Sequence, residues 1–389
     1  MIQWKQFSEE RIDMTQESVA QQNHLSVRSR IYRILSDTEG TFSKKDLAEM
    51  CGISMPTLHQ NLKELIDEGL ISYTDEWQHT GGRRARGLDI VPDARFAVGI
   101  FLNRTACRIV AADLRLNEMA YENVPFDFEG CIAGTAPKVS ELLEHFLSGA
   151  SLDRSRLLGV CVAIPGIISK DELTIEFAPT FGVRNQPVSA LLGDIPYPVH
   201  VVNDATASGR AEYFTRKKTG NMAYLSLENG VGGTVFIAGS PYDGDHSRSG
   251  EFGHICVEPG GLPCSCGKLG CLEPYISPQR IKTSLGVTIE EFFQGVENHD
   301  PVYISLFFDM LRHLAVGINS IRMTLDCDVV LGGFLSEYLE PYLLILRSYV
   351  LAGNPFEENA DFVEFSILRR HITALGAALY FIRRFVENV

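Results

Sequence analysis

Two features that mark exported or membrane proteins are missing from this 389-residue sequence. The first ten residues hold no apolar stretch of the kind that forms the centre of a secretory signal peptide. No apolar run approaches the length needed to cross a bilayer. We therefore expect a cytoplasmic protein that does not insert into membranes and whose nine cysteines are reduced.

An excess of positive charge is missing as well. The chain carries 35 lysines and arginines against 49 acidic residues, so its net charge is −14. This balance excludes a protein that coats nucleic acid over its whole surface, but it allows a small local DNA reader. The length exceeds one typical hydrophobic core, and we expect two or three folded units.

A cluster of zinc-type ligands is present. His254, Cys264, Cys266 and Cys271 fall within eighteen positions, with glycines between them. Zinc prefers four nitrogen or sulfur ligands in a tetrahedron, and four protein ligands leave no open position, so we predict a structural zinc ion. Ordinary buried thiols or a disulfide are the alternatives. Cys256 could replace one ligand, although its apolar neighbours favour a core position.

Residues 23–89 have the pattern of a winged helix-turn-helix. Apolar spacing predicts a first helix over 26–36. Ser43 and Asp46 form a capping-box pattern that begins a second helix, which ends at Cys51-Gly52. A third helix is predicted from Met55 to Gly69, followed by a hairpin. The tight turn at Gly52 between two short helices indicates a DNA-binding motif.

The third predicted helix leaves polar side chains on its open face that can reach bases or phosphates of a double-stranded operator. The arginines in the following hairpin suit a narrow minor groove or phosphate contact, although a solvated linker is the alternative. The candidate DNA-binding residues are Thr57, His59, Gln60, Lys63, Arg83, Arg84 and Arg86. Residues 1–90 carry eleven basic and fourteen acidic side chains, a net charge of −3. We therefore expect a homo-oligomer that pairs two weak half-sites.

From about Phe96 the sequence alternates apolar strands with helices. The predicted strands are 96–101, 106–111, 117–124, 158–164, 199–202, 222–227, 233–238 and 329–331, and the predicted helices are 139–146, 205–214, 304–325 and 371–389. Short apolar strands between helices are typical of an α/β sheet covered on both faces. Two such cycles predict two lobes with a ligand cleft between them. We therefore divide the chain into a DNA-binding unit, residues 1–90, and a two-lobed unit, residues 91–389.

The run Gly250-Glu-Phe-Gly-His254, followed by Cys264-x-Cys266-x4-Cys271-Leu-Glu273, resembles the ROK family of repressors, open reading frames and sugar kinases. With the helix-turn-helix, the resemblance covers nearly the whole chain from residue 23 and is strongest to the transcriptional-regulator branch. It implies a two-lobed actin-like ATPase fold, a sugar between the lobes, and dimers or tetramers.

The first phosphate-binding segment of the family's kinases is not kept. Those kinases carry Asp-x-Gly-x-Thr after the first strand, whereas this chain has Phe101-Leu-Asn103-Arg104-Thr105. A phenylalanine cannot hold Mg²⁺, and side chains at the glycine positions obstruct a nucleotide. A second glycine segment, 227–234, is better kept. We therefore predict a protein that is not an enzyme, and an ATP-dependent sugar kinase with a DNA-binding module is the alternative.

The resemblance also implies a set of sugar-binding residues: Asn203, Asp204, Glu251, His254 and Glu273. Pro179-Thr180 stands where the kinases have Pro-Asn, which leaves the sugar unidentified. These residues predict a sugar-responsive transcriptional regulator, most simply a repressor of carbohydrate genes that a small sugar releases from DNA. A possible protein partner could instead dock on the closing helix through Ala374, Leu375, Ala378, Leu379 and Ile382, unless that face packs against the core.

Overall fold

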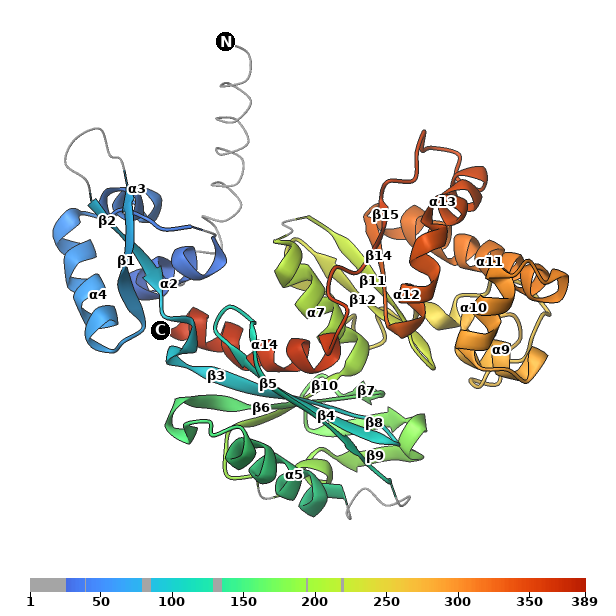
Figure 1. The fold of residues 1–389 in the computed structure, drawn as a ribbon, viewed down its shortest axis with the longest axis horizontal. Coiled ribbons are helices and arrows are strands. Elements are labelled where there is room, and N and C mark those ends of the chain that lie inside the picture. Colours follow the sequence, from blue (N-terminus) through green and yellow to red (C-terminus); the bar gives the residue numbers. More distant parts are fainter. Residues whose placement is uncertain (1–25, 39, 79–84, 129–134, 194, 218–219) are drawn as a thin grey trace, which may run out of the picture.

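The computed structural model describes residues 26–38, 40–78, 85–128, 135–193, 195–217 and 220–389 (Figure 1). The N-terminal module comprises α2 (Val27–Asp37), α3 (Lys44–Cys51), α4 (Met55–Asp67), β1 (Ile71–Gln78) and β2 (Ala85–Ile90). The predicted capping box is present, because Asp46 N–H donates to Ser43 Oγ and Ser43 N–H donates to Asp46. Gly52 has a φ of 62°, which turns the chain between α3 and α4. The predicted winged helix-turn-helix is confirmed.

The first lobe is a five-stranded sheet in the order β10-β6-β3-β4-β5. Its strands are β3 (Phe96–Leu102), β4 (Ala106–Asp113), β5 (Glu118–Pro125), β6 (Leu157–Ile164) and β10 (Val199–Asn203). β3, β4 and β5 form an antiparallel meander, and β6 runs parallel to β3 and β10. Every residue of β3 is buried, because its alternate side chains enter two different cores. One of these cores includes α5 (Thr135–Gly149), and the other includes α14 (Ile372–Asn388).

The second lobe is another five-stranded sheet, in the order β13-β12-β11-β14-β15. Its strands are β11 (Met222–Leu227), β12 (Val231–Ile237), β13 (Ser240–Pro241), β14 (Asp328–Gly332) and β15 (Val363–Phe365). The helix α7 (Asp204–Arg216) packs on one face. The rest of the lobe holds α8 (Glu273–Ile276), α9 (Pro278–Leu285), α10 (Ile289–Glu297), α11 (Pro301–Leu325), α12 (Phe334–Leu339) and α13 (Leu343–Ala352). The predicted two-lobed α/β architecture is therefore confirmed.

Several short elements escaped the sequence patterns. A three-stranded sheet, β7 (Ile167–Ile168), β8 (Thr174–Ala178) and β9 (Val183–Pro187), follows β6, and α6 (Ser189–Leu192) follows that sheet. The helices α8, α9, α10, α12 and α13 and the strand β15 were not predicted either. Most of them are too short to show a period.

The closing helix α14 connects both lobes with the DNA-binding module (Figure 1). A Cβ at Gly376 would lie 1.8 Å from Ala207 O of α7, and a Cβ at Gly99 of β3 would lie 1.8 Å from Ala374 O. These two glycines let α14 fit tightly between β3 and α7. All five residues proposed as a partner-docking face are buried here, so the core-packing alternative is correct for this helix.

The far end of α14 meets α2. Ser29 Oγ donates a hydrogen bond to Val389 O at 2.7 Å, and Arg383 pairs with Asp37 at 2.5 Å. Tyr32 packs edge-on against Phe385. One continuous hydrophobic cluster therefore runs from the helix-turn-helix through α14 to both sheets.

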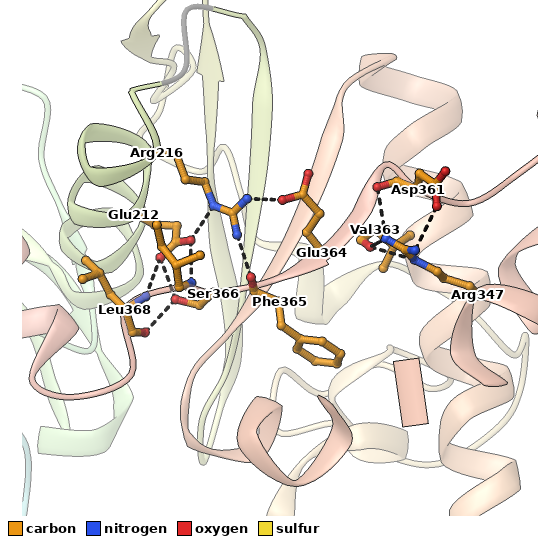
Figure 2. Close-up of polar contacts among 10 residues, drawn as sticks. Glu212, Arg216, Arg347, Asp361, Val363, Glu364, Phe365, Ser366 and Leu368 are labelled. Carbon is orange, nitrogen blue, oxygen red and sulfur yellow. Dashed lines mark hydrogen bonds and ion pairs between the residues drawn. The ribbon is translucent and has the colours of Figure 1, made fainter. Parts of the chain in front are cut away.

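A buried ionic network fixes the segment that leads from β15 to α14 (Figure 2). Glu212 of α7 is fully buried and accepts hydrogen bonds from Ser366 Oγ at 2.6 Å, Ile367 N–H at 2.9 Å and Leu368 N–H at 3.3 Å. Arg216 donates to Glu212 and Glu364, and also to Phe365 O at 2.6 Å. On the other side of β15, Arg347 of α13 binds the chain at Asp361 and Val363.

By length and composition, α11 is apolar enough to cross a membrane, contrary to the expectation that no segment comes close. It is the single candidate span in the described part of the chain, which makes it weak evidence of insertion. Its buried side chains, such as Phe307, Leu311, Leu314 and Ile318, belong to the core of the second lobe. A core helix of a large domain has this composition.

Candidate functional site

The four predicted metal ligands come together. The ligand atoms of His254, Cys264, Cys266 and Cys271 all lie within 4.8 Å of one another. Cys264 Sγ is 3.6 Å from His254 Nδ1, and Cys266 Sγ is 3.7 Å from Cys271 Sγ. Zinc–sulfur bonds of about 2.3 Å give a tetrahedron with edges of about 3.8 Å. The residues therefore fit a zinc ion.

The loop between these ligands depends on glycine. Gly267 and Gly270 have φ values of 83° and 81°, and a Cβ at Gly270 would lie 1.8 Å from Glu258 O. A hydrogen bond from the backbone N–H of Lys268 lowers the pKa of the Cys266 thiol, which favours the thiolate that zinc binds. This effect is confined to Cys266, because burial raises the pKa of Cys271 to about 12.

Cys256 was expected in the core, and this expectation was wrong. Its side chain is exposed. It lies in a short extended segment directly opposite Cys271, and this segment belongs to the loop surface. The apolar neighbours Ile255 and Val257 are only half-buried, so their composition gave a misleading indication of depth.

Glu251 lies close enough to Asp204 for its charge to act on that carboxylate, and Glu273 lies close enough to act on Glu251. Asp204 begins α7, Glu251 lies in the turn after β13, and Glu273 begins α8. Glu251 Oε2 is 3.8 Å from His254 Nε2, the ring nitrogen that does not face Cys264. The two carboxylate oxygens of Glu273 accept hydrogen bonds from Val231 N–H at 3.0 Å and Ser265 Oγ at 3.1 Å.

Burial raises the pKa values of two of these carboxylates. It raises the pKa of Asp204 to about 6, and the nearby charge of Glu251 adds to the effect. It also raises the pKa of Glu251, where the charge of Glu273 adds and His254 opposes. Carboxylates that lie close together in a partly dry site are stabilised by hydrogen-bond donors. The arrangement therefore favours a ligand with several hydroxyl groups.

Asn203 is used differently from the other predicted sugar residues. It is the N-cap of α7, and its side-chain oxygen accepts from Thr206 N–H at 2.9 Å. Its amide nitrogen donates to Gly166 O at 3.0 Å. The side chain thus ties the turn at Pro165-Gly166 to the start of α7, which positions the adjacent Asp204.

In the loop that corresponds to the kinases' phosphate loop, the side chain of Asn103 binds the backbone N–H groups of the same loop. Asn103 Oδ1 accepts hydrogen bonds from Thr105 N–H at 3.0 Å and Ala106 N–H at 2.8 Å. These backbone donors are therefore not directed at a phosphate. Phe101 is 8% exposed, and the Arg108 guanidinium lies 5.6 Å from the centre of its ring. Both side chains line a cavity of about 80 Å³ between the lobes.

Glu228 is a half-buried acid in this cavity that the sequence did not single out. Burial raises the pKa of Glu228 to about 7, although Phe334 N–H donates a hydrogen bond to Oε1 at 3.1 Å. The one sequence feature that could have indicated Glu228 is its position in the second glycine segment, 227–234. Gly233 in that segment has a folding role, because a Cβ there would lie 2.3 Å from Tyr224 O.

The predicted DNA-reading side chains of α4 share an exposed face. Thr57, His59, Gln60 and Lys63 are all exposed, whereas Leu58, Leu62 and Leu65 are buried. Ser54 caps the helix by accepting from Thr57 N–H at 3.3 Å. Arg86 is the second residue of β2, the second wing strand, and is exposed. Arg83 and Arg84 lie outside the described residues.

Comparison with known proteins agrees with this architecture. The model of the ROK family matches residues 98–384, and a model of winged helix-turn-helix DNA-binding domains matches residues 26–72. Because the first match spans most of the chain, this protein belongs to the ROK family.

Among curated relatives, the xylose repressor of Bacillus subtilis (strain 168) is 25% identical over 369 residues, which cover 89% of this chain and 92% of that protein. The DNA-binding transcriptional dual regulator NagC of Escherichia coli (strain K12) is 29% identical over 278 residues, covering 68% of this chain and 66% of NagC.

Two solved structures share the fold. A ROK family transcriptional regulator, described as a homolog of the E. coli MLC protein, has a TM-score of 0.75 at 21% identity and covers 92% of this chain and 96% of its own. A ROK glucokinase from Streptomyces griseus, in complex with glucose and AMPPNP, has a TM-score of 0.61 at 23% identity, with coverages of 73% and 98%. The kinase match covers 73% of this chain, whereas the regulator match covers 92% of it.

Proposed function

We propose that this protein is a sugar-responsive transcriptional repressor that binds a double-stranded operator in the cytoplasm. The observation that carries the proposal is the combination of an exposed recognition face on α4 with an acidic, half-buried cluster in the lobed domain. Two relatives that match most of the chain are named xylose repressor and N-acetylglucosamine repressor. D-Xylose and N-acetylglucosamine are therefore the first effectors to test.

In the proposed sugar site, Asp204, Glu251 and Glu273 accept hydrogen bonds from sugar hydroxyls, and Asn203 positions Asp204. His254 would bind zinc through Nδ1 and leave Nε2 to donate to Glu251 or to the sugar. Zinc would supply no chemistry here beyond cross-linking the loop. A site of buried acceptors rejects analogues that lack the matching hydroxyl, because a carboxylate is then left without a donor.

The proposed route from sugar to DNA is α14. Ser208 Oγ and Thr373 Oγ1 are 2.9 Å apart. This contact links α7, one turn after Asp204, to the first turn of α14. The far end of α14 contacts α2 of the helix-turn-helix. A sugar that binds one arrangement of the lobes better would therefore shift the position of the DNA-binding module.

The kinase alternative is not favoured. Asn103 occupies the backbone donors that a phosphate needs, and Phe101 replaces the carboxylate that would hold Mg²⁺. The chain also carries a match to winged helix-turn-helix DNA-binding domains over residues 26–72. We accordingly propose no catalytic residue.

We propose a DNA-binding unit of residues 1–90 and a sugar-binding unit of residues 91–389, assembled as a homodimer or homotetramer. Thr57, His59, Gln60, Lys63 and the arginines at 83, 84 and 86 would contact DNA. The module's net charge of −3 supports paired half-sites, because one copy lacks the charge for tight phosphate binding.

A thermal-shift screen of the full-length protein against mono- and disaccharides tests the sugar site. A gel shift with the promoter of a neighbouring carbohydrate gene, with and without the stabilising sugar, tests regulation. The expected result is a sugar that raises the melting temperature and weakens operator binding. Operator binding unchanged by every stabilising sugar would contradict the proposal, and sugar-dependent turnover of ATP would restore the kinase alternative.

A further inference from the structure

Cys256 is the cysteine near the candidate zinc centre that the ligand set does not use. It lies on a short antiparallel pair of segments in which Leu272 N–H donates to Ile255 O at 2.9 Å and Val257 N–H donates to Gly270 O at 2.8 Å. These two hydrogen bonds flank Cys256 and Cys271, which face each other in an isolated bridge. The two cysteines are therefore a non-hydrogen-bonded pair.

This position suits a disulfide bond. In a non-hydrogen-bonded antiparallel pair the two Cα atoms are about 4.5 Å apart and the side chains lie on the same face. Disulfides span Cα separations of about 4.4–6.8 Å. Cys256 is exposed, so an oxidant in solvent can reach its sulfur, whereas Cys271 is 3% exposed. One cysteine is thus suited to react first and the other to resolve the product.

We propose that Cys256 and Cys271 form a peroxide-sensitive pair that competes with metal binding. In the first step the Cys256 thiolate attacks hydrogen peroxide, and the O–O bond breaks to give a sulfenic acid and hydroxide, which takes up the proton released by the Cys256 thiol and becomes water. The Cys271 sulfur then attacks the Cys256 sulfur, and the hydroxide that leaves takes up the proton of the Cys271 thiol to form a second water. The two thiols lose two electrons and two protons in total, and one peroxide becomes two waters.

The disulfide removes one of the four candidate zinc ligands, so only His254, Cys264 and Cys266 remain. Cys271 is also two residues before Glu273, which holds Val231 N–H and Ser265 Oγ. Loss of the metal would loosen this loop beside the acidic cluster. This consequence rests on the proposed function, whereas formation of the disulfide does not.

The test uses full-length protein, with and without one equivalent of zinc, treated with hydrogen peroxide and then alkylated. Trypsin cleavage after Lys268 separates the peptide that contains Cys256 from the one that contains Cys271. We expect a cross-link between these peptides, located at Cys256 by fragmentation, together with loss of zinc. Cys256→Ser should keep its zinc at the same peroxide dose, and Cys51→Ala, which removes a thiol of α3, should behave like the wild type.

A cross-link from Cys271 to Cys264 or Cys266 instead, or equal zinc loss in Cys256→Ser, would overturn the inference. The metal-free sample tests disulfide formation separately from competition with zinc, because the disulfide is expected there too. Its absence in that sample refutes the cysteine pair alone. Failure of the reduced wild-type protein to bind zinc refutes the metal part of the proposed function.

Discussion

The substitution Glu212→Ala tests whether the network in Figure 2 holds the segment before α14 in place. The change removes the acceptor of four hydrogen bonds. Ser366 keeps an acceptor in Leu368 O at 2.7 Å, and Arg216 keeps Glu364 and Phe365 O. The backbone N–H of Leu368 has no replacement partner, and Arg216, 7% exposed, loses its fully buried counter-charge.

A buried donor left without a partner costs about 1–3 kcal/mol, and loss of one member of a buried ion pair costs about 3–5 kcal/mol. Ile367 is 53% exposed, so water can partly satisfy its N–H group. We therefore expect Glu212→Ala to destabilise the protein by about 2–5 kcal/mol. Replacement by glutamine should cost less, because its carbonyl oxygen still accepts one of the N–H groups.

The matched control is Glu364→Ala, which removes the other carboxylate from the same guanidinium. The Glu364 side chain is 35% exposed, and we expect a cost of at most about 1 kcal/mol. Urea unfolding of the full-length proteins, followed by circular dichroism and compared at the midpoints, measures both changes. A midpoint for Glu212→Ala equal to that of Glu364→Ala would refute the reasoning, because the buried carboxylate would then contribute no more than the half-exposed one.

Four further outcomes are expected. Burial raises the pKa of Asp204 to about 6, so the carboxylate loses its charge below that pH; sugar affinity measured by calorimetry should fall as the pH drops through 6, and Asp204→Asn should bind weakly with a smaller dependence on pH, because the raised pKa of Glu251 remains. Cys264→Ser should lose zinc by atomic emission and lower the melting temperature, and retained zinc would contradict the ligand set. Lys63→Ala should weaken all operator sequences alike and reduce the slope of log affinity against log salt by about one. Asp37→Asn removes the ion pair with Arg383 and should cost little stability, yet reduce the effect of sugar on DNA affinity; an unchanged effect in gel shifts would argue against α14 as the route.

Features encoded by local spacing could be predicted from the sequence. The capping box at Ser43 and the turn at Gly52 act over three or four residues, and the structure has both. The four zinc-type ligands come together because glycine-rich turns bring near neighbours into one tetrahedron. The acidic cluster could be assembled only through resemblance to a family, since Asp204 and Glu273 are distant in the chain.

Features that depend on distant partners could not be predicted. Glu212 looks like an ordinary surface glutamate on a helix, yet its partners lie 154–156 residues further along the chain. Asn203 looks like a ligand-binding amide, but its hydrogen bonds are made within the protein. The exposure of Cys256 follows from the path of the loop, which its apolar neighbours do not encode.

The closed turn at Asn103 also limits how this chain can evolve. Losing the asparagine alone would remove the acceptor of two amide protons, one exposed and one half-buried, at a cost below the roughly 1–3 kcal/mol of a fully buried donor. Restoring an aspartate at position 101 alone would introduce a carboxylate at an 8% exposed site, which carries a desolvation cost. Each single step back toward nucleotide chemistry is therefore unfavourable, and natural selection would have to find several changes at once.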